Sequence, residues 1–297
     1  MTDTARTLIT VVIPTYGARG ALARAVDSAL AQQGVDLDVV VVDDNNPDTP
    51  ARKATQAIMD AYAADSRVRY ICHQHNRNGA AARNTGIHAA KGEYVAFLDD
   101  DDMFLPGKLR AQLDYLNANP QFDAVYCLAC RDGKALPATP YEGNASEHIL
   151  MMEASMYTPT LMMRRQALLH SGAFDESFRR HQDYQMLLSF FRHGHRIGCL
   201  QQVYTELGGN EGENYVTGEA LNKLKKNFLG LFATVIDRID KEQPGFRNRV
   251  YARHYAAVFL QHVKGRHWGM ALGTLKYFFK SPSTFTKVLT ASVRAHL

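Results

Sequence analysis

The chain has 297 residues, of which 46% are hydrophobic and 22% are charged, and it carries only four cysteines. This is an ordinary globular composition, and the length fits one large domain or one domain with an appendage. The cysteines are too few for a disulfide scaffold, the N-terminus lacks the apolar stretch of a signal peptide, and no run of about 18 apolar residues could span a membrane. We therefore expect a reduced, cytoplasmic protein, with no nucleic-acid partner.

The net charge of +4 conceals an asymmetry along the chain. From Thr217 onward there are 14 Lys and Arg against 4 Asp and Glu, a local charge of +10, so the preceding residues carry −6. An acidic body with a basic tail indicates a different partner for each part. We predict a domain at residues 1–216 and a basic helical region at residues 217–297.

Strands and helices alternate through the first part of the chain. Residues 8–14 form a continuous apolar, β-branched run, as expected of a strand buried on both faces, and residues 19–33 show helical spacing. The remaining predicted strands are 37–42, 68–72, 94–98, 124–128, 161–164 and 198–203, and the remaining predicted helices are 50–64, 79–90, 108–117, 165–170 and 182–192. This alternation predicts an α/β fold with right-handed crossovers and a parallel sheet.

Polar clusters follow three of these predicted strands. They are Thr15-Tyr16-Gly17, Asp43-Asp44 and the run from Asp99 to Asp102. Ligands of parallel sheets collect at the carboxyl ends of the strands, so we expect the three clusters to meet at one crevice.

The run YVAFLDDDDM places four carboxylates directly after a buried strand, which is costly unless positive charge is present. In an extended segment Asp99 and Asp101 would share a face. Oxygen ligands suit Mg²⁺ or Mn²⁺, and Mg²⁺ takes one or two carboxylates together with water and phosphate oxygens. The run therefore predicts a metal–diphosphate site, and the alternative is an acidic loop in water.

Four segments, in this order and spacing, resemble the family 2 glycosyltransferases over roughly residues 8–205. They are VVIPTYGARGALARAVDSALAQ, VVVVDDNNPD, NRNGAAARNTGIHAAKGEYVAFLDDDD and SGAFDESFRRHQDYQMLLSF. The resemblance implies the GT-A fold, a Rossmann-like, mostly parallel central sheet flanked by helices, here followed by the helical C-terminal region. It also implies inverting transfer of a sugar from a nucleotide-sugar donor.

The resemblance assigns nucleotide-binding roles near the first strands. Pro14, Thr15 and Tyr16 match the loop that lines the nucleotide pocket. Asp43 matches the carboxylate that hydrogen-bonds the base, usually uracil. Arg83, in AARNTGI, matches an arginine that contacts the nucleotide.

The resemblance also assigns the chemical groups. Asp99 and Asp101 match the first and last acidic residues of the D-x-D motif, near the ribose and on the metal, and Asp100 between them is grouped with the substrate site. Asp183, in HQDYQM, matches the presumed general base. Gln182 stands where glutamate is more frequent, which leaves the base intact but removes a neighbouring charge.

The residue chemistry agrees with these roles. A divalent cation stabilises the departing nucleoside diphosphate, and the attacking hydroxyl needs a base within hydrogen-bond reach. At the start of a predicted helix, Asp183 would be favoured in its ionised form by the helix dipole. The structural alternatives are a helix N-cap for Asp183, a turn residue for Asp43 and a solvated side chain for Arg83.

The sequence allows two interpretations for each of two later segments. Residues 208–218 (GGNEGENYVTG) form a lid over the donor or a linker, and they lack the basic segment that many family members carry there. Residues 264–280 combine apolar and basic side chains, which suits either an anionic membrane surface, at the inner face of the cytoplasmic membrane, or a helix packed on the catalytic domain. The apolar members are Trp268, Leu272, Leu275 and Phe279, and the basic ones are Lys264, Arg266, Lys276 and Lys280.

We therefore predict an inverting, Mn²⁺- or Mg²⁺-dependent glycosyltransferase that uses a UDP-sugar. The expected acceptor is a glycan or lipid-linked glycan of cell-surface polysaccharide biosynthesis. One alternative is a sugar nucleotidyltransferase. Such an enzyme needs a Gly-rich, basic loop after the first strand to bind a triphosphate, and the segment IPTYGARG does not supply it. The other is a non-catalytic nucleotide- or glycan-binding subunit, whose mark would be a broken D-x-D or a missing base.

Overall fold

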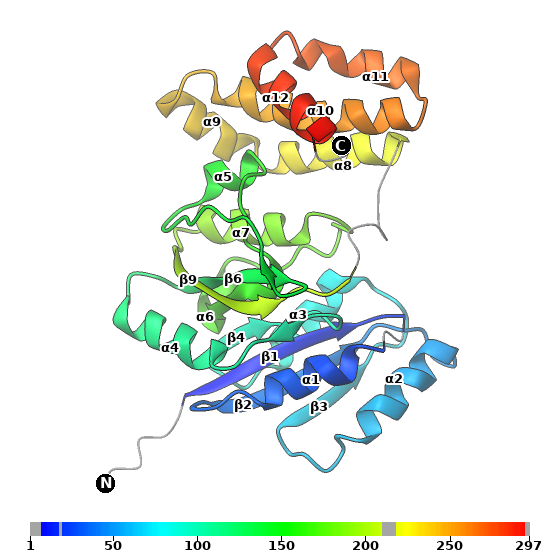
Figure 1. Cartoon of the computed structure of the whole chain (residues 1–297), viewed down its shortest axis with the longest axis vertical. Coiled ribbons are helices and arrows are strands. Elements are labelled where there is room, and N and C mark those ends of the chain that lie inside the picture. The colour runs from blue at the N-terminus through cyan, green and yellow to red at the C-terminus, as the bar shows by residue number, and fades with distance from the viewer. Residues whose placement is uncertain (1–6, 18–19, 210–217, 295–297) are drawn as a thin grey trace. The chain divides into compact units, whose positions relative to one another are not determined.

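The computed structural model describes residues 7–17, 20–209 and 218–294, with side chains as far as residue 291 (Figure 1). The chain divides into two compact units, here called the α/β unit and the helical unit. The α/β unit comprises Met1–Ala145 and Ser155–Gly209, and the helical unit comprises Ser146–Ala154 and Asn210–Leu297. The predicted boundary at residues 216/217 lies outside the described residues.

Within the described residues, the α/β unit holds one nine-stranded sheet in the order β3-β2-β1-β4-β8-β6-β9-β5, with β7 paired to β6 (Figure 1). The strands are β1 (Leu8–Thr15), β2 (Asp36–Asp43), β3 (Val68–Cys72), β4 (Tyr94–Phe97), β5 (Met103–Phe104), β6 (Ala124–Arg131), β7 (Lys134–Ala135), β8 (Leu161–Arg164) and β9 (Ile197–Glu206). The long ladders β1–β2, β2–β3, β1–β4 and β6–β9 are parallel, as the alternation predicts. The shorter ladders that β8, β5 and β7 form are antiparallel, so the sheet is mixed.

The helices of the α/β unit cover both faces of this sheet. They are α1 (Leu22–Leu30), α2 (Pro50–Asp60), α3 (Gly79–Ala89), α4 (Lys108–Ala118), α6 (Arg165–His170) and α7 (Gln182–Arg192), with a 3-10 turn η1 (Thr158–Thr160). One core joins α1, α2 and α4 to alternate residues of β1 and β2, including Val11 and Val39. Residues that point the other way, Val40 and Val42, pack with Ala82 of α3. The alternation along the strands therefore places α3 on the opposite face from α1.

Helix α3 lies directly on β1. A Cβ atom at Gly86 would come within 2.3 Å of Val12 Cγ1, so only glycine permits this approach. The helix begins at Asn78, whose side chain accepts hydrogen bonds from the backbone N–H groups of Ala80 and Ala81 at 2.9 and 3.2 Å. These two constraints fix the helix along its axis and against the sheet, and with it the side chains that α3 carries.

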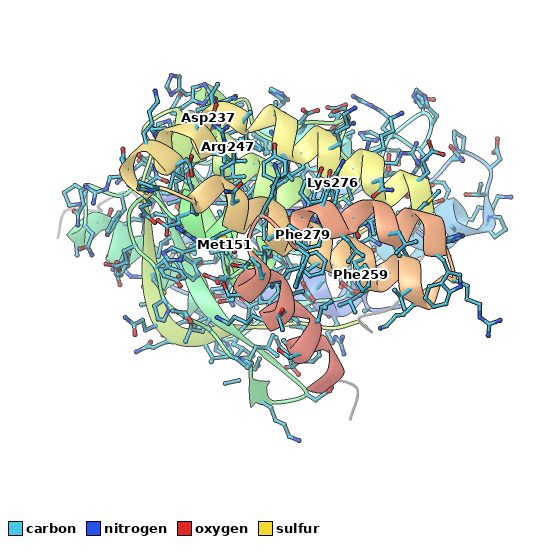
Figure 2. All side chains as sticks on the ribbon, turned by 90° about the horizontal axis from the view of Figure 1, so that it is seen from above. Met151, Asp237, Arg247, Phe259, Lys276 and Phe279 are labelled. Carbon is cyan, nitrogen blue, oxygen red and sulfur yellow. The ribbon has the colours of Figure 1, made fainter. Side chains whose placement is uncertain are left out.

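The helical unit contains α5 (Ser146–Leu150), α8 (Gly218–Leu231), α9 (Ala233–Glu242), α10 (Phe246–Lys264), α11 (Trp268–Thr274), η2 (Leu275–Tyr277) and α12 (Pro282–Arg294). The helices α9 and α10 are separated near residue 244, α10 and α11 near residue 265, and η2 and α12 near residue 281. Helices α10 and α12 share a core in which Ala252 and Ala256 meet Phe285. An ion pair between Arg247 and Asp237, 2.5 Å between Nη2 and Oδ1, joins α10 to α9 (Figure 2).

Helix α5 belongs to the helical unit although it lies in the middle of the sequence. Its Ile149 and Leu150 have no exposed surface. His254 Nε2 of α10 lies 2.8 Å from the Leu150 carbonyl oxygen, and Gln243 Nε2 donates to Glu147 Oε2 at 2.8 Å. Among the described residues, none of the helices combines the length and the hydropathy needed to cross a bilayer.

Candidate active site

The three predicted polar clusters lie at adjacent strand ends. Thr15 of β1 is the register partner of Asp43 of β2, and β4 pairs with the other side of β1. The Thr15 hydroxyl donates to Asp100 Oδ2 at 2.6 Å, and the Gly17 N–H donates to Asn45 Oδ1 at 2.9 Å. The sheet therefore brings the ends of β1, β2 and β4 to one place, as the sequence predicts.

The acidic run is a turn, and not the extended segment that the sequence suggests. The Asp102 N–H donates to the Asp99 carbonyl oxygen at 3.1 Å, which closes the turn. Asp100 and Asp102 point inward and are only 7% and 6% exposed, whereas Asp99 and Asp101 are half-buried. The turn thus keeps the alternation that was expected: Asp99 and Asp101 are the two carboxylates of the run that reach solvent.

The chain after β9 holds this turn from the other side. The Gly208 N–H donates to Asp102 Oδ1 at 2.8 Å. A Cβ at Gly208 would lie 1.9 Å from the Asp101 carbonyl oxygen, and one at Gly209 would lie 2.7 Å from Asp101 Oδ2. Gly208 is therefore required by its closeness to the Asp101 backbone, and Gly209 by its φ of +70° together with the nearby Asp101 carboxylate. Burial, reinforced by Asp99 and the other carboxylates of the run, raises the pKa of Asp102 to about 8.

Arg83 connects this turn to the start of α7. Its Nη2 lies 2.5 Å from Asp99 Oδ1, and its Nη1 donates to Gln182 Oε1 at 3.1 Å. Its guanidinium also lies over the ring of Phe174, 5.6 Å from the centroid. The Arg83 side chain is only 13% exposed, and its Nε is buried without a hydrogen-bond partner among the described residues. Arg83 is therefore a buried, directed cation at the site and not a solvated surface residue.

Asp183 lies in the first turn of α7, and its neighbour His181 occupies the N-cap position with a φ of 58°. The carboxylate Oδ1 accepts the Tyr184 N–H at 2.8 Å. Loss of water contact raises the pKa of Asp183; the positive charge of Arg83 opposes this shift and the negative charge of Asp99 adds to it. Both charges act on Asp183, so it shares one electrostatic neighbourhood with the Arg83–Asp99 pair.

Asp43 lies beneath the surface and has no exposed area. Its Oδ1 accepts from the N–H and the Nδ2 of Asn45 at 2.8 and 2.7 Å, and its Oδ2 accepts from the Tyr70 hydroxyl at 2.5 Å. Arg52 Nε lies 3.0 Å from the same oxygen. Because both oxygens have protein partners, contact between Asp43 and a nucleotide base would require one of these partners to be exchanged.

The family model described as "Glycosyl transferase family 2" matches residues 10–208, about two thirds of the chain. The chain belongs to this family. Two curated glycan-biosynthesis proteins are similar to it. The succinoglycan biosynthesis protein ExoO of Rhizobium meliloti is 34% identical over 203 residues, which cover 63% of this chain and 57% of ExoO. The amylovoran biosynthesis glycosyltransferase AmsB of Erwinia amylovora is 29% identical over 203 residues, which cover 65% of this chain and 66% of AmsB.

The fold is also found in solved structures. S. aureus TarS 1–349, in complex with UDP-GlcNAc, superposes with a TM-score of 0.69 at 18% identity, covering 94% of this chain and 83% of that one. The match confirms the predicted GT-A fold and the helical C-terminal region. The chain spans 57% of the length of ExoO, so the activity of the whole of that relative is not transferred by the match.

Metal binding by this glycosyltransferase would depend on few protein ligands. Among the described residues, no group of three or more His, Cys, Asp or Glu side chains is arranged to hold a metal ion. The acidic turn offers oxygen donors only, with Asp99 and Asp101 half-buried at its surface. Such a donor set suits Mg²⁺ or Mn²⁺ that takes its other ligands from a diphosphate and water.

The sequence reasoning missed the role of Asp44 in this glycosyltransferase. Asp44 is 2% exposed, and its oxygens bind His73 Nδ1 at 2.7 Å, Asn76 Nδ2 at 2.8 Å, and the N–H groups of Arg77 and Asn78 at 2.8 Å each. This network fixes the loop that leads into α3 and so positions Arg83 indirectly. The signal was the pair Asp43-Asp44 followed by the Asn-rich loop, but the sequence cannot show that they meet.

Proposed function

We propose that the protein is an inverting, metal-dependent glycosyltransferase that takes its sugar from a nucleotide-sugar donor, most consistent with a UDP-sugar. The observation that carries the proposal is the link made by Arg83. One guanidinium contacts Asp99 in the acidic turn and Gln182, the neighbour of Asp183. A donor-binding group and a carboxylate of raised pKa therefore lie in one neighbourhood, which is the requirement for a displacement at an activated sugar.

The nucleotide would occupy the ends of β1, β2 and β4. Tyr16 is 58% exposed beside the buried Thr15 and supplies an aromatic face for a base. Pro14 and Thr15 would line the same pocket, and Asp43 would shape it through Asn45, which also accepts a hydrogen bond from the Gly17 N–H. TarS, which shares the fold, is in complex with UDP-GlcNAc, and this agrees with a UDP-sugar for the present chain.

The acidic turn and Arg83 would hold the diphosphate. Asp99 and Asp101 reach solvent, and Asp100 is held behind them by Thr15. We assign Asp101 as the metal ligand and Asp99 and Asp100 to the substrate site. A divalent ion bound there supplies a Lewis acid for the charge that develops on the leaving nucleoside diphosphate. The Nε of Arg83, buried without a partner among the described residues, could donate to a phosphate oxygen if donor binding uncovers it.

Asp183 would act as the general base. Its raised pKa makes the ionised carboxylate a stronger proton acceptor, and the start of α7 stabilises the carboxylate that must be present before the reaction. A single carboxylate that removes the proton of the incoming hydroxyl leads to one displacement and so to inversion. The relatives ExoO and AmsB support a glycan or lipid-linked glycan acceptor in polysaccharide biosynthesis.

The direct test is thermal denaturation of the full chain with UDP, GDP or CDP, each with Mn²⁺, Mg²⁺ or EDTA, followed by a screen of UDP-sugars for release of UDP. We expect UDP with Mn²⁺ to raise the melting temperature by about 2–4 °C for each kcal/mol by which the bound ligand stabilises the folded chain. Stabilisation by nucleoside triphosphates alone would favour a nucleotidyltransferase. Stabilisation by UDP-sugars without any turnover would favour a binding subunit.

The membrane contact is a separate part of this proposal. Trp268, Leu272 and Phe279 are 61%, 66% and 77% exposed in a unit of high positive charge, and Figure 2 shows Phe279 together with the basic Lys276. Exposed apolar and basic side chains together suit an anionic bilayer surface. Replacing all three apolar residues by Ser should reduce co-sedimentation with phosphatidylglycerol vesicles. Equal sedimentation of the variant and the wild type would contradict the contact.

A further inference from the structure

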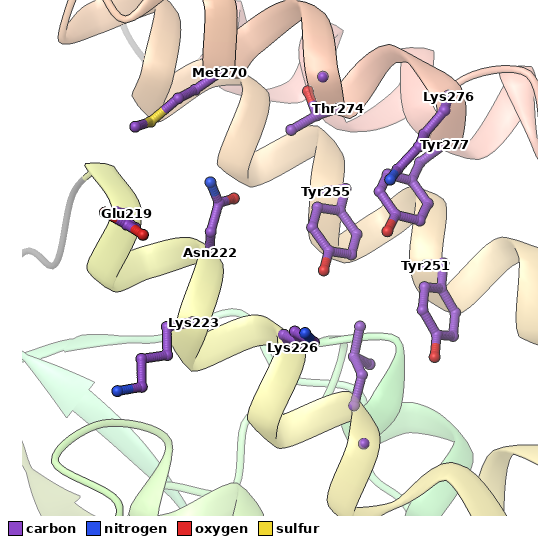
Figure 3. A pocket seen from close by; sticks show the side chains of 13 residues that line it. Glu219, Asn222, Lys223, Lys226, Tyr251, Tyr255, Met270, Thr274, Lys276 and Tyr277 are labelled. Atoms are coloured by element: carbon purple, nitrogen blue, oxygen red, sulfur yellow. The ribbon is translucent and has the colours of Figure 1, made fainter.

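The helical unit contains a cavity of about 910 Å³ bounded by α8, α10, α11 and η2 (Figure 3). All four elements belong to the helical unit, so the cavity is complete without the α/β unit. Its volume lies in the range of small-molecule binding sites, ~300–1,000 Å³. None of the candidate active-site residues lines it.

One wall of the cavity is a stack of three tyrosines. The rings of Tyr255 and Tyr277 lie 3.9 Å apart between centroids and are nearly parallel, at 6°, and Tyr251 lies 5.9 Å from Tyr277. Figure 3 shows the three side chains extending from α10 and η2 toward α8. Burial raises the pKa of Tyr251 and of Tyr255, so their hydroxyls remain protonated and can donate hydrogen bonds. Stacked tyrosines form a rigid wall with polar tips, which binds ligands at little entropic cost.

The opposite wall is basic. Lys223 and Lys226 lie one turn apart on α8, both are exposed, and neither forms an ion pair or hydrogen bond within the described residues. On the tyrosine side, Lys276 Nζ lies 5.2 Å from the centroid of the Tyr277 ring. Three lysines line this concave site, where positive charge attracts an anion more strongly than on a convex surface.

The remaining lining distinguishes among anions. Glu219 and Asn222 of α8 line the same cavity, together with Thr274 of α11, whose hydroxyl donates to the Ala271 carbonyl oxygen at 2.7 Å and leaves its oxygen as an acceptor. A carboxylate, an amide and a hydroxyl suit a ligand rich in hydroxyl groups. A polyphosphate has no hydroxyl groups to donate to this carboxylate, so it would gain nothing that offsets the charge repulsion.

The cavity is also distinct from the exposed apolar surface of α11. Met270, Gly273, Thr274 and Tyr277 follow helical spacing and line the cavity. Trp268 and Leu272, which suit a bilayer, are not part of the lining and lie at positions on another face. The apolar residues proposed to meet a bilayer are therefore separate from the cavity lining, and Lys276 alone is named for both.

We infer that this cavity binds an anionic oligosaccharide, a sugar chain that carries carboxylate or phosphate substituents. Its hydroxyls would meet the tyrosine, Asn222 and Glu219 groups, and its negative charges would meet Lys223 and Lys226. The identification of this oligosaccharide as the glycan acceptor rests on the function proposed above, whereas the binding site itself does not.

Isothermal titration of the full chain with tetragalacturonate tests this inference, because this probe combines sugar rings with four carboxylates. We expect one site per chain, and binding weakened roughly tenfold or more when Lys223→Glu and Lys226→Glu are combined. Tyr251→Ala should weaken binding as well. The matched control combines Lys241→Glu with Lys287→Glu, which changes the charge of the same unit equally at exposed positions outside the cavity and should leave the affinity within about twofold.

The other outcomes overturn the inference. Equal weakening by both pairs of variants would show diffuse charge attraction. Maltotetraose binding as tightly as the probe would show a site for neutral sugars, and inorganic phosphate competing as well as the probe would show a phosphate site. Phosphatidylglycerol vesicles bound through Lys223 and Lys226, without binding of tetragalacturonate, would show a membrane surface. UDP titrated on the same variants separates the two proposals, because loss of probe binding with UDP binding retained leaves the glycosyltransferase proposal intact.

Discussion

Gln182 accepts a hydrogen bond from Arg83 at 3.1 Å, while the second terminal nitrogen of the same guanidinium lies 2.5 Å from Asp99. The amide is a neutral acceptor. The charge of Arg83 is therefore balanced within this trio by Asp99 alone, and the neighbouring Asp183 feels a positive group that a glutamate at position 182 would have partly neutralised. A glutamine and not a glutamate at position 182 thus has an electrostatic consequence for the candidate base.

Asp183→Asn should strongly reduce sugar transfer while the enzyme still binds the nucleotide. The amide cannot take the proton of the incoming hydroxyl, so we expect kcat to fall by roughly 10²–10⁴-fold. UDP binding, measured by titration, should change by less than about threefold. Asp175→Asn is the matched control, because Asp175 contacts Ser177 and lies outside the proposed machinery. Transfer near the wild-type rate in Asp183→Asn would remove Asp183 from the base assignment.

Activity should have an acidic limb that belongs to Asp183. Its pKa is raised above the ordinary value of 3.8, and the base must be ionised, so kcat/KM should fall as the pH drops through the raised pKa. Gln182→Glu adds a negative charge nearby and should move this limb to higher pH. Gln182→Ala removes the hydrogen bond without adding charge and serves as the control. A limb that moves to lower pH in Gln182→Glu would contradict the electrostatic argument.

Arg83→Lys should not preserve nucleotide binding. A guanidinium contacts Asp99 and Gln182 through separate nitrogens, and an ammonium group at the end of a lysine cannot reproduce this planar fork. We expect UDP affinity to fall by about tenfold to hundredfold in both Arg83→Lys and Arg83→Ala. Arg77→Lys, at an exposed ion pair with Glu176, is the control. Full affinity in Arg83→Lys would show that only a positive charge is needed there.

Gly209→Ala should weaken metal-dependent binding specifically. The new Cβ would lie 2.7 Å from Asp101 Oδ2, in a residue whose φ is +70°. Gly133→Ala is a matched control, since Gly133 has a φ of +72° with nothing within 4 Å of a Cβ. The two variants should lose similar stability from backbone strain, ~1–2 kcal/mol. Only Gly209→Ala should reduce the Mn²⁺-dependent part of UDP binding, and equal effects of the two variants on UDP binding would refute this.

Lys108 should give the fold a measurable pH dependence. Burial lowers its pKa from 10.5 to about 8, so between these pH values the unfolded chain holds the proton that the folded chain has lost. The free energy of unfolding should therefore rise with pH across this window, by about 3 kcal/mol from this residue. Denaturant unfolding at pH 7 and pH 10 should show a smaller rise in Lys108→Met than in the exposed control Lys134→Met. The same rise in both variants would contradict the assignment to Lys108.

The sequence predicted those parts of the fold that depend on local pattern. Continuous β-branched runs such as residues 37–42 indicated buried parallel strands, and both the GT-A fold and the family are confirmed. The antiparallel insertion of β8 between β4 and β6 was not visible, because four residues carry no signal for which strands they pair with. Strand pairing of this kind is settled by tertiary packing and not by local propensity.

For the candidate site too, the sequence predicted local features but not contacts between distant segments. Alternate exposure of Asp99 and Asp101 was expected for an extended segment and is achieved by a turn, since both geometries separate neighbouring side chains. The sequence could not show that both carboxylate oxygens of Asp43 accept hydrogen bonds from Asn45 and Tyr70, because Tyr70 comes from a different strand. The roles assigned to the site residues therefore stay predictions.

Because α5 belongs to the helical unit, the polypeptide passes from one unit to the other three times, after residues 145, 154 and 209. The helical unit is thus built from two separate segments of the sequence, residues 146–154 and 210–297. It is not a C-terminal tail that truncation could remove as a whole. Truncation at residue 209 would remove the helices that form one unit with α5. The buried side chains of Ile149 and Leu150 would then be exposed and leave an aggregation-prone apolar surface on the remaining protein. Evolutionary exchange of the helical unit in such a protein would require two coordinated insertions, and laboratory domain swaps should carry residues 146–154 along with the C-terminal helices.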